Sequence, residues 1–245
     1  MSRNRQERPA GAVPAVIRTL LLVLLALHVA MTVVQPRPRA RAEELPAPPP
    51  LPVLKTLSGG DPIPLAQALA LHLQAFDNQP GISIPFAELD YGKVLAWLKR
   101  ILELDPHTEY PLLMASHLYA QVPDEDKERR MLAFVYQEFL ADPNHRWRWL
   151  AHAAIIAKHR LHDLPLALKY AEALAQHATA PSVPHWAQQM HIFLREDMGE
   201  YQTARVLLGG LLASDAIKDP HELRFLLERL QQMKGAEKSS SPSEK

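Results

Sequence analysis

Apolar residues recur at intervals of three and four along most of the chain, which is the period of an amphipathic helix. The first such stripe begins at Leu65 and the strongest one covers residues 91–104. Only 9 glycines, against 22 prolines, and few β-branched runs argue against a β-rich fold. The pattern predicts an all-α domain over residues 65–234, with helices near 66–76, 91–104, 110–120, 126–140, 147–161, 166–177, 183–198, 203–214 and 221–233.

Four prolines divide this helical region into units of similar length. They lie 37, 38 and 39 residues apart, and each interval holds two amphipathic segments joined by a polar turn. One helix pair of this length buries too little apolar surface to offset the entropy of ordering it. The repeat therefore predicts a stack of antiparallel helix pairs, closed by a shorter, more charged capping helix at 221–233. The four prolines are Pro106, Pro143, Pro181 and Pro220.

Three short motifs within residues 90–220 resemble the tetratricopeptide repeat. The turn Gly199-Glu200-Tyr201 precedes Ala204, and the endings Leu104-Asp105-Pro106 and Ala141-Asp142-Pro143 are similar to the Leu-Asp-Pro that closes a repeat of that family. The period is three to five residues longer, and the usual tryptophan and Leu-Gly pair are absent at the aligned positions. The longer pattern is also similar to uncharacterised membrane-linked proteins of Gram-negative bacteria. The resemblance implies a right-handed superhelix of stacked antiparallel helix pairs with a groove along the first helices.

The most apolar stretch covers residues 19–34, and residues 13–18 extend it to the length of a bilayer. We predict a transmembrane signal-anchor helix at 13–34 that follows a cytoplasmic tail at 1–12. Two alternatives stay open. Ala40-Arg41-Ala42 could mark the cleavage site of a signal peptide, although arginines just after the apolar core are unusual there. Arginines on both sides of the stretch also leave the reverse orientation open.

Polar or proline-rich segments flank the predicted helical domain. Residues 35–64 contain three consecutive prolines, which favours an extended, semi-rigid linker. Residues 235–245 are rich in serine, lysine and glutamate, which is typical of a disordered tail.

The net charge of zero conceals a difference between the two ends of the chain. Residues 1–42 carry seven arginines and one glutamate, so +6, and residues 43–245 balance them with −6. Arginine near a membrane segment suits anionic lipid, whereas an acidic body is a poor binder of nucleic acid. The chain has no cysteine, which excludes disulfides and thiolate chemistry. We expect the membrane, and not nucleic acid, to be a partner.

Candidates for chemistry are weak. Histidines gather in residues 145–163, where His159, His162 and Asp163 could share a metal, but histidines also favour helix carboxyl ends without one. The carboxylates of Glu196 and Asp197 are more typical of solvated charges near a turn. No nucleophile motif or phosphate-binding glycine loop is present. We expect no enzyme activity, no metal and no cofactor.

Two sets of residues are candidates for binding a partner protein. Trp147 and Trp149 flank Arg148, a composition common at interface hot spots. The resemblance implies that polar residues of the first helices face the groove, and these would suit an acidic or carboxylate-ended peptide. The implied groove residues are Lys158, His162, Gln188, His191 and Arg195.

These observations favour a non-enzymatic scaffold or adaptor. We expect a single-pass protein of the bacterial inner membrane whose helical domain lies in the periplasm and binds another envelope protein or peptide. An export complex or a cytochrome maturation complex would be a suitable setting, by analogy only. The alternative is a periplasmic helical protein that binds a small molecule or a lipid in an apolar pocket.

Overall fold

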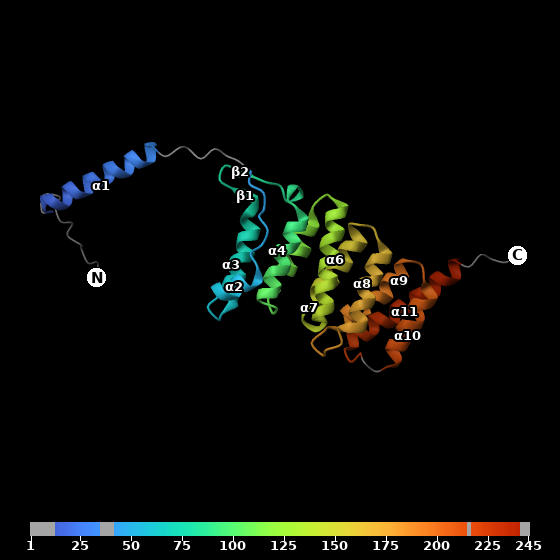
Figure 1. The fold of residues 1–245 in the computed structure, drawn as a ribbon. Coiled ribbons are helices and arrows are strands. Elements are labelled where there is room, and N and C mark those ends of the chain that lie inside the picture. Colours follow the sequence, from blue (N-terminus) through green and yellow to red (C-terminus); the bar gives the residue numbers. More distant parts are fainter. Residues whose placement is uncertain (1–12, 35–41, 215–216, 241–245) are drawn as a thin grey trace, which may run out of the picture. The chain divides into compact units, whose positions relative to one another are not determined.

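The computed structural model describes residues 13–34, 42–214 and 217–240, and the chain forms two units (Figure 1). The N-terminal unit is built around a single helix, α1 (Ala15–Val34). Residues Ala15–Thr32 of this helix are long and apolar enough to cross a membrane, and none of them is buried. An apolar helix is present where the sequence predicts one, over 15–34 instead of 13–34, whereas the predicted tail at 1–12 lies outside the described residues.

The second unit is almost entirely helical, and consecutive helices pack side by side (Figure 1). Short β-strands, β1 (Asn78–Gln79) and β2 (Ile82–Ser83), form one small hairpin. A π-helical segment, η4 (Met114–Leu118), follows α5. The helices are α2 (Leu51–Leu57), α3 (Pro62–Gln74), α4 (Tyr91–Leu104), α5 (Tyr110–Leu113), α6 (Glu125–Ala141), α7 (Pro143–His159), α8 (Leu164–His177), α9 (His185–Asp197), α10 (Tyr201–Ala213) and α11 (Pro220–Ser240).

Helix starts follow the local sequence. Asp124 and Asp163 accept hydrogen bonds from backbone N–H groups in the first turns of α6 and α8 at 3.1 and 2.9 Å. Asp90 does the same for α4. Pro143 and Pro220 are the first residues of α7 and α11. Pro106 and Pro181 lie in the connections that lead into α5 and α9. The spaced prolines therefore divide the helical region, as the sequence predicts.

Small and large side chains both contribute to the core. Ala153, Ala157, Ala167 and Ala171 are fully buried where α7 packs against α8, so these helices approach closely. Phe139 and other bulky residues are buried between the helices. One large core cluster runs from Leu45 and Leu54 through α3 and α4 to α9, and a smaller one joins α9, α10 and α11.

Side-chain contacts also connect several helices to the next but one. We call α3, α5 with η4, α7, α9 and α11 the odd row, and α4, α6, α8 and α10 the even row. The paired residues in these contacts are separated by 32 to 40 positions in the sequence. In the odd row the pairs include Gln74–Tyr110, His117–Trp149, Trp147–Trp186 and Gln189–Glu222; in the even row they include Arg129–Asp163 and Tyr136–Tyr170.

The segment after α1 differs from the predicted linker at 35–64. Residues 43–57, which we call the strap, pack on the helical unit, and Leu45 and Leu54 are buried. The Trp97 indole donates a 2.8 Å hydrogen bond to the Pro46 carbonyl. Proline-rich backbone has free carbonyl groups and few N–H groups, so it binds donors of α4 while the two leucines enter the core. Residues 35–41 lie outside the described residues.

The carboxyl end also differs from the prediction. The predicted capping helix at 221–233 continues as α11 to Ser240, so residues 235–240 of the predicted disordered tail are helical. Leu226 and Met233 are buried and tie α11 to the smaller core cluster. Residues 241–245 lie outside the described residues.

Candidate functional site

Exposed large apolar side chains of the described helices α3–α11 gather on the odd row. Seven of the nine such residues are found there. The even row carries the other two, Leu140 on α6 and Val206 on α10. Exposed apolar residues that concentrate on one set of helices mark an interaction surface more strongly than scattered ones do. The odd-row residues are Ile63 and Leu71 on α3, Ile155 on α7, Trp186 on α9, and Leu223, Phe225 and Leu227 on α11.

Helix α7 lies at the middle of this surface. Arg148, Ile155 and His159 recur at intervals of seven and four, so they share its exposed face. The two tryptophans lie on either side of that face. Trp149 points toward the preceding odd-row helix, where its indole donates a 2.9 Å hydrogen bond to Glu109. Trp147 points toward α9.

Aromatic rings continue the surface from α7 across α9 to α11. Trp147 and Trp186 meet edge to face with their ring centroids 5.5 Å apart. Phe193 lies two helical turns after Trp186, and its ring is 6.1 Å from that of Phe225. Trp186 and Phe225 remain 50% and 55% exposed, so about half of the surface of each residue is free for a partner. We call Trp147, Trp149, Ile155, Trp186, Phe193 and Phe225 the aromatic face.

Two histidines extend the aromatic face toward η4. The rings of His117 and His152 stack in parallel, 3.9 Å apart. Burial and the neighbouring His117 lower the pKa of His152, whose Nε2 atom is buried without a hydrogen-bond partner. Ser116 lies 3.0 Å from His117, but its hydroxyl is buried and donates to the Leu112 carbonyl. This arrangement positions aromatic rings and does not present an activated nucleophile.

The histidine-rich segment has no clustered metal ligands in the described structure. The described residues contain no group of three or more histidine, aspartate or glutamate side chains able to hold a metal ion. His145 instead contacts the carboxylate of Asp142 at 2.9 Å, and His159 is exposed on the free face of α7.

Other residues proposed from the sequence lie beside the aromatic face. Lys158 forms an ion pair with Asp197, which joins α7 to α9. His162 is exposed in the turn between α7 and α8, where its φ of 51° lies in the left-handed region. Lys158 therefore has an intramolecular partner for its charge, whereas His162 faces solvent.

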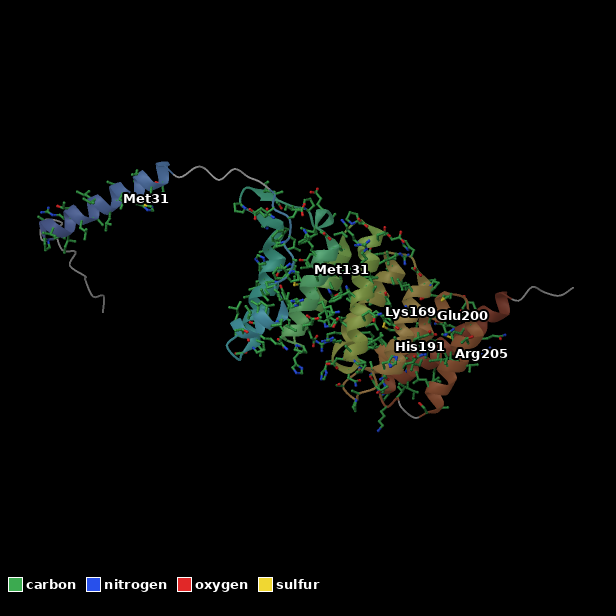
Figure 2. The ribbon with its side chains drawn as sticks, viewed as in Figure 1. Met31, Met131, Lys169, His191, Glu200 and Arg205 are labelled. Atoms are coloured by element: carbon green, nitrogen blue, oxygen red, sulfur yellow. The ribbon has the colours of Figure 1, made fainter. Side chains whose placement is uncertain are left out.

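Gln188, His191 and Arg195 come together at the contact between α8 and α9, away from the aromatic face. Arg195 pairs with Glu172 of α8 and, at 2.6 Å, with Glu200. Gln188 donates to the carbonyl of Ala178 at 2.8 Å, and burial lowers the pKa of His191. Figure 2 labels His191 and Glu200 in this region. The three residues share one side of α9, and that side packs on α8 where the resemblance implies an open groove.

A pocket lies at the other end of the odd row, between α3 and α5. It encloses about 400 Å³, and its walls include the exposed Leu71 and the small Ala66 and Ala70. Gln67 and Thr108 supply polar groups at the pocket. The sequence pattern shows the apolar stripe of α3 but not the space left beside it.

Comparisons with known proteins add no relative to this picture. No protein-family model, no curated protein and no solved structure matches this chain.

Proposed function

We propose that this chain is a membrane-anchored scaffold that binds another protein of the bacterial envelope through the aromatic face. In this proposal, α1 is a single-pass signal anchor in the inner membrane. The second unit is a right-handed superhelix of stacked antiparallel helix pairs, similar to tetratricopeptide repeats, and lies in the periplasm. The activity is binding, without catalysis, as part of an export or maturation complex.

The repeated contacts support the proposed stack. Each spaced proline begins an odd-row helix or lies in the connection that leads into one, and contacts between alternate helices recur at about one unit of sequence separation. Such contacts between neighbouring units are what a linear stack of helix pairs requires. A stack of this kind offers a long surface on the first helix of each pair, and here that helix belongs to the odd row.

The observation that carries the binding role is the aromatic face itself. Tryptophan and arginine dominate interface hot spots, because large rings bury much apolar area with few rotatable bonds. Here Trp147 and Trp186 contact each other, and Arg148 lies over the Trp147 ring at 5.8 Å. The ring contacts hold these side chains in place before a partner arrives, which lowers the entropy cost of binding.

The geometry changes the partner that we expect. The charges of Lys158 and Arg195 are neutralised by carboxylates of the same chain, so they supply little attraction for an acidic peptide. The aromatic face suits a partner that presents an apolar surface. We therefore propose an apolar helix or loop of an envelope protein as the bound element.

Site-specific photo-crosslinking in native membranes tests this proposal. A crosslinking amino acid replaces Ile155 or Trp186 on the aromatic face, and Leu140 on the even row as the control, in the full-length chain. We expect the same crosslinked product from both aromatic-face positions and none from Leu140, since all three side chains are exposed. The proposal fails if Leu140 gives the same product or if neither aromatic-face position gives one.

The purified partner then allows a quantitative test. Trp186→Ala should weaken its binding by about 2 kcal/mol, or roughly 30-fold, as expected for a half-exposed hot-spot ring. Val206→Ala is the matched control, because this side chain is 71% exposed on the even row. Equal losses from the two substitutions would show that the partner does not use the aromatic face.

A further inference from the structure

A groove lies on the even row, between α4 and α6. It is an open depression of about 370 Å³. Small residues from both helices, Ala96 and Ala133, leave this space open, and both are exposed. Leu95 and Phe134 are half-buried beside them and give the groove apolar walls. The groove is large enough for one or two side chains of a peptide and is separate from the aromatic face.

Two cations line this groove without a counter-charge. Lys99 comes from α4 and Arg130 from α6, and both are exposed. Among the described residues, neither has an ion pair or a side-chain hydrogen bond. The other basic residues of these two helices do form ion pairs with carboxylates; they are Lys93, Arg100, Lys127 and Arg129. The unpaired cations of α4 and α6 are thus the ones that meet at the groove.

The one carboxylate that lines the groove is already bound. Glu138 accepts a 2.9 Å hydrogen bond from Arg146, whose side chain is only 7% exposed. Arg146 also donates to the carbonyls of Glu138 and Pro106, which fixes it in place. The carboxylate of Glu138 therefore balances Arg146 and leaves Lys99 and Arg130 with their full charge.

We infer that this groove binds an acidic peptide segment in which an apolar side chain lies between two carboxylates. The apolar side chain would occupy the space over Ala96 and Ala133. The carboxylates would pair with Lys99 and Arg130, and the exposed amide of Gln137 can bond to the peptide backbone. Opposite charge on groove and ligand favours this occupant over a neutral or basic one.

Peptide binding to the full-length chain tests the inference. The chain is placed in nanodiscs of zwitterionic phosphatidylcholine, and the probe is a fluorescein-labelled eight-residue peptide with glutamates on both sides of a Leu-Phe pair. We expect saturable binding by fluorescence polarisation, weakening as salt is raised. The double substitution Lys99→Glu and Arg130→Glu should weaken it by about tenfold or more. Lys55→Glu, which reverses an exposed charge on α2, should leave the affinity unchanged.

Further variants separate this groove from the aromatic face and from the membrane. Ala133→Trp fills the groove without changing charge and should abolish peptide binding, whereas Trp186→Ala should leave it intact even if the proposed envelope partner is lost. The inference is overturned if the peptide does not saturate, if Lys55→Glu weakens binding as much as the double substitution, or if a peptide with lysines in place of glutamates binds equally well. It is also overturned if the double substitution of Lys99 and Arg130 weakens the binding of added anionic lipid vesicles and leaves the binding of the peptide unchanged.

Discussion

Replacing Leu54 with alanine tests whether the strap is part of the folded helical unit. Leu54 is 2% exposed and belongs to the main core cluster, whereas Leu57, one turn later on the same short helix, is 69% exposed. The two leucines therefore offer the same chemical change in opposite environments. A flexible linker would tolerate both substitutions equally.

The magnitude follows from burial. Complete burial of a leucine side chain contributes about 1.5–3 kcal/mol, and the cavity left by truncation raises the usual cost to about 2–5 kcal/mol. Leu54 lies near one end of the helical unit, where neighbours can move into the space, so we expect about 2–4 kcal/mol. Leu57→Ala should change the free energy of unfolding by no more than about 0.5 kcal/mol.

Hydrogen–deuterium exchange on the full-length chain gives the required local measurement. A linear array of helices can open at one end while the rest stays folded, so a global unfolding signal could miss the effect. A loss of 2–4 kcal/mol should accelerate exchange in the strap and the first turns of α3 about 30- to 900-fold. Equal exchange in the Leu54→Ala and Leu57→Ala variants would refute the packed strap.

Three further substitutions test other features of the helical unit. Arg146→Met should lower the free energy of unfolding by about 3 kcal/mol in chemical denaturation, because it leaves the carboxylate of Glu138 without its partner. Arg148→Met is the control: this side chain is 55% exposed, so the substitution should cost less than about 1 kcal/mol. Gly199→Ala should lower the melting temperature and cost about 1–2 kcal/mol of folding free energy, because φ at this residue is +79°. Gly209→Ala, inside α10, should raise the melting temperature, because a Cβ atom there would contact no other atom and alanine favours the helix. His152→Phe should reduce the acid sensitivity of the melting temperature. The pKa of His152 is lowered in the folded state, so its contribution to stability is complete above the ordinary value near 6.5 and declines as the pH falls from there through the lowered pKa. An unchanged pH profile between 7.5 and 5 would contradict this role.

The helices were predictable because their signals are local. Apolar spacing, aspartate caps and prolines act within a few residues, and in the structure Asp124 and Asp163 cap two of the helices that the apolar spacing predicts. The strap was not predictable in this way. Its contacts to Trp97 and the core join residues about fifty positions apart, and proline-rich composition is equally typical of a free linker.

The candidate site shows the same division between local and long-range information. The composition around Arg148 is enough to make Trp147 and Trp149 candidates for binding, and both belong to the aromatic face. Phe193 and Phe225 become part of it only when α11 folds back beside α9. For Gln188, His191 and Arg195, the helical period shows that they share a side of α9, but only the ion pair to Glu172 reveals that this side packs on α8.

The strap also bears on how the helical unit ends. A linear array of helix pairs exposes an apolar face at each end unless a further element covers it. At the carboxyl end, α11 packs on α10 and buries Leu226. At the amino end, the strap, which includes α2, packs against α4; Leu45 and Leu54 are buried, and the Pro46 carbonyl accepts a hydrogen bond from Trp97. If the strap closes that end, loss of its leucines should increase exchange in the first helices and leave α7, α8 and the aromatic face unchanged, because α7 and α8 pack mainly against each other, α6 and α9.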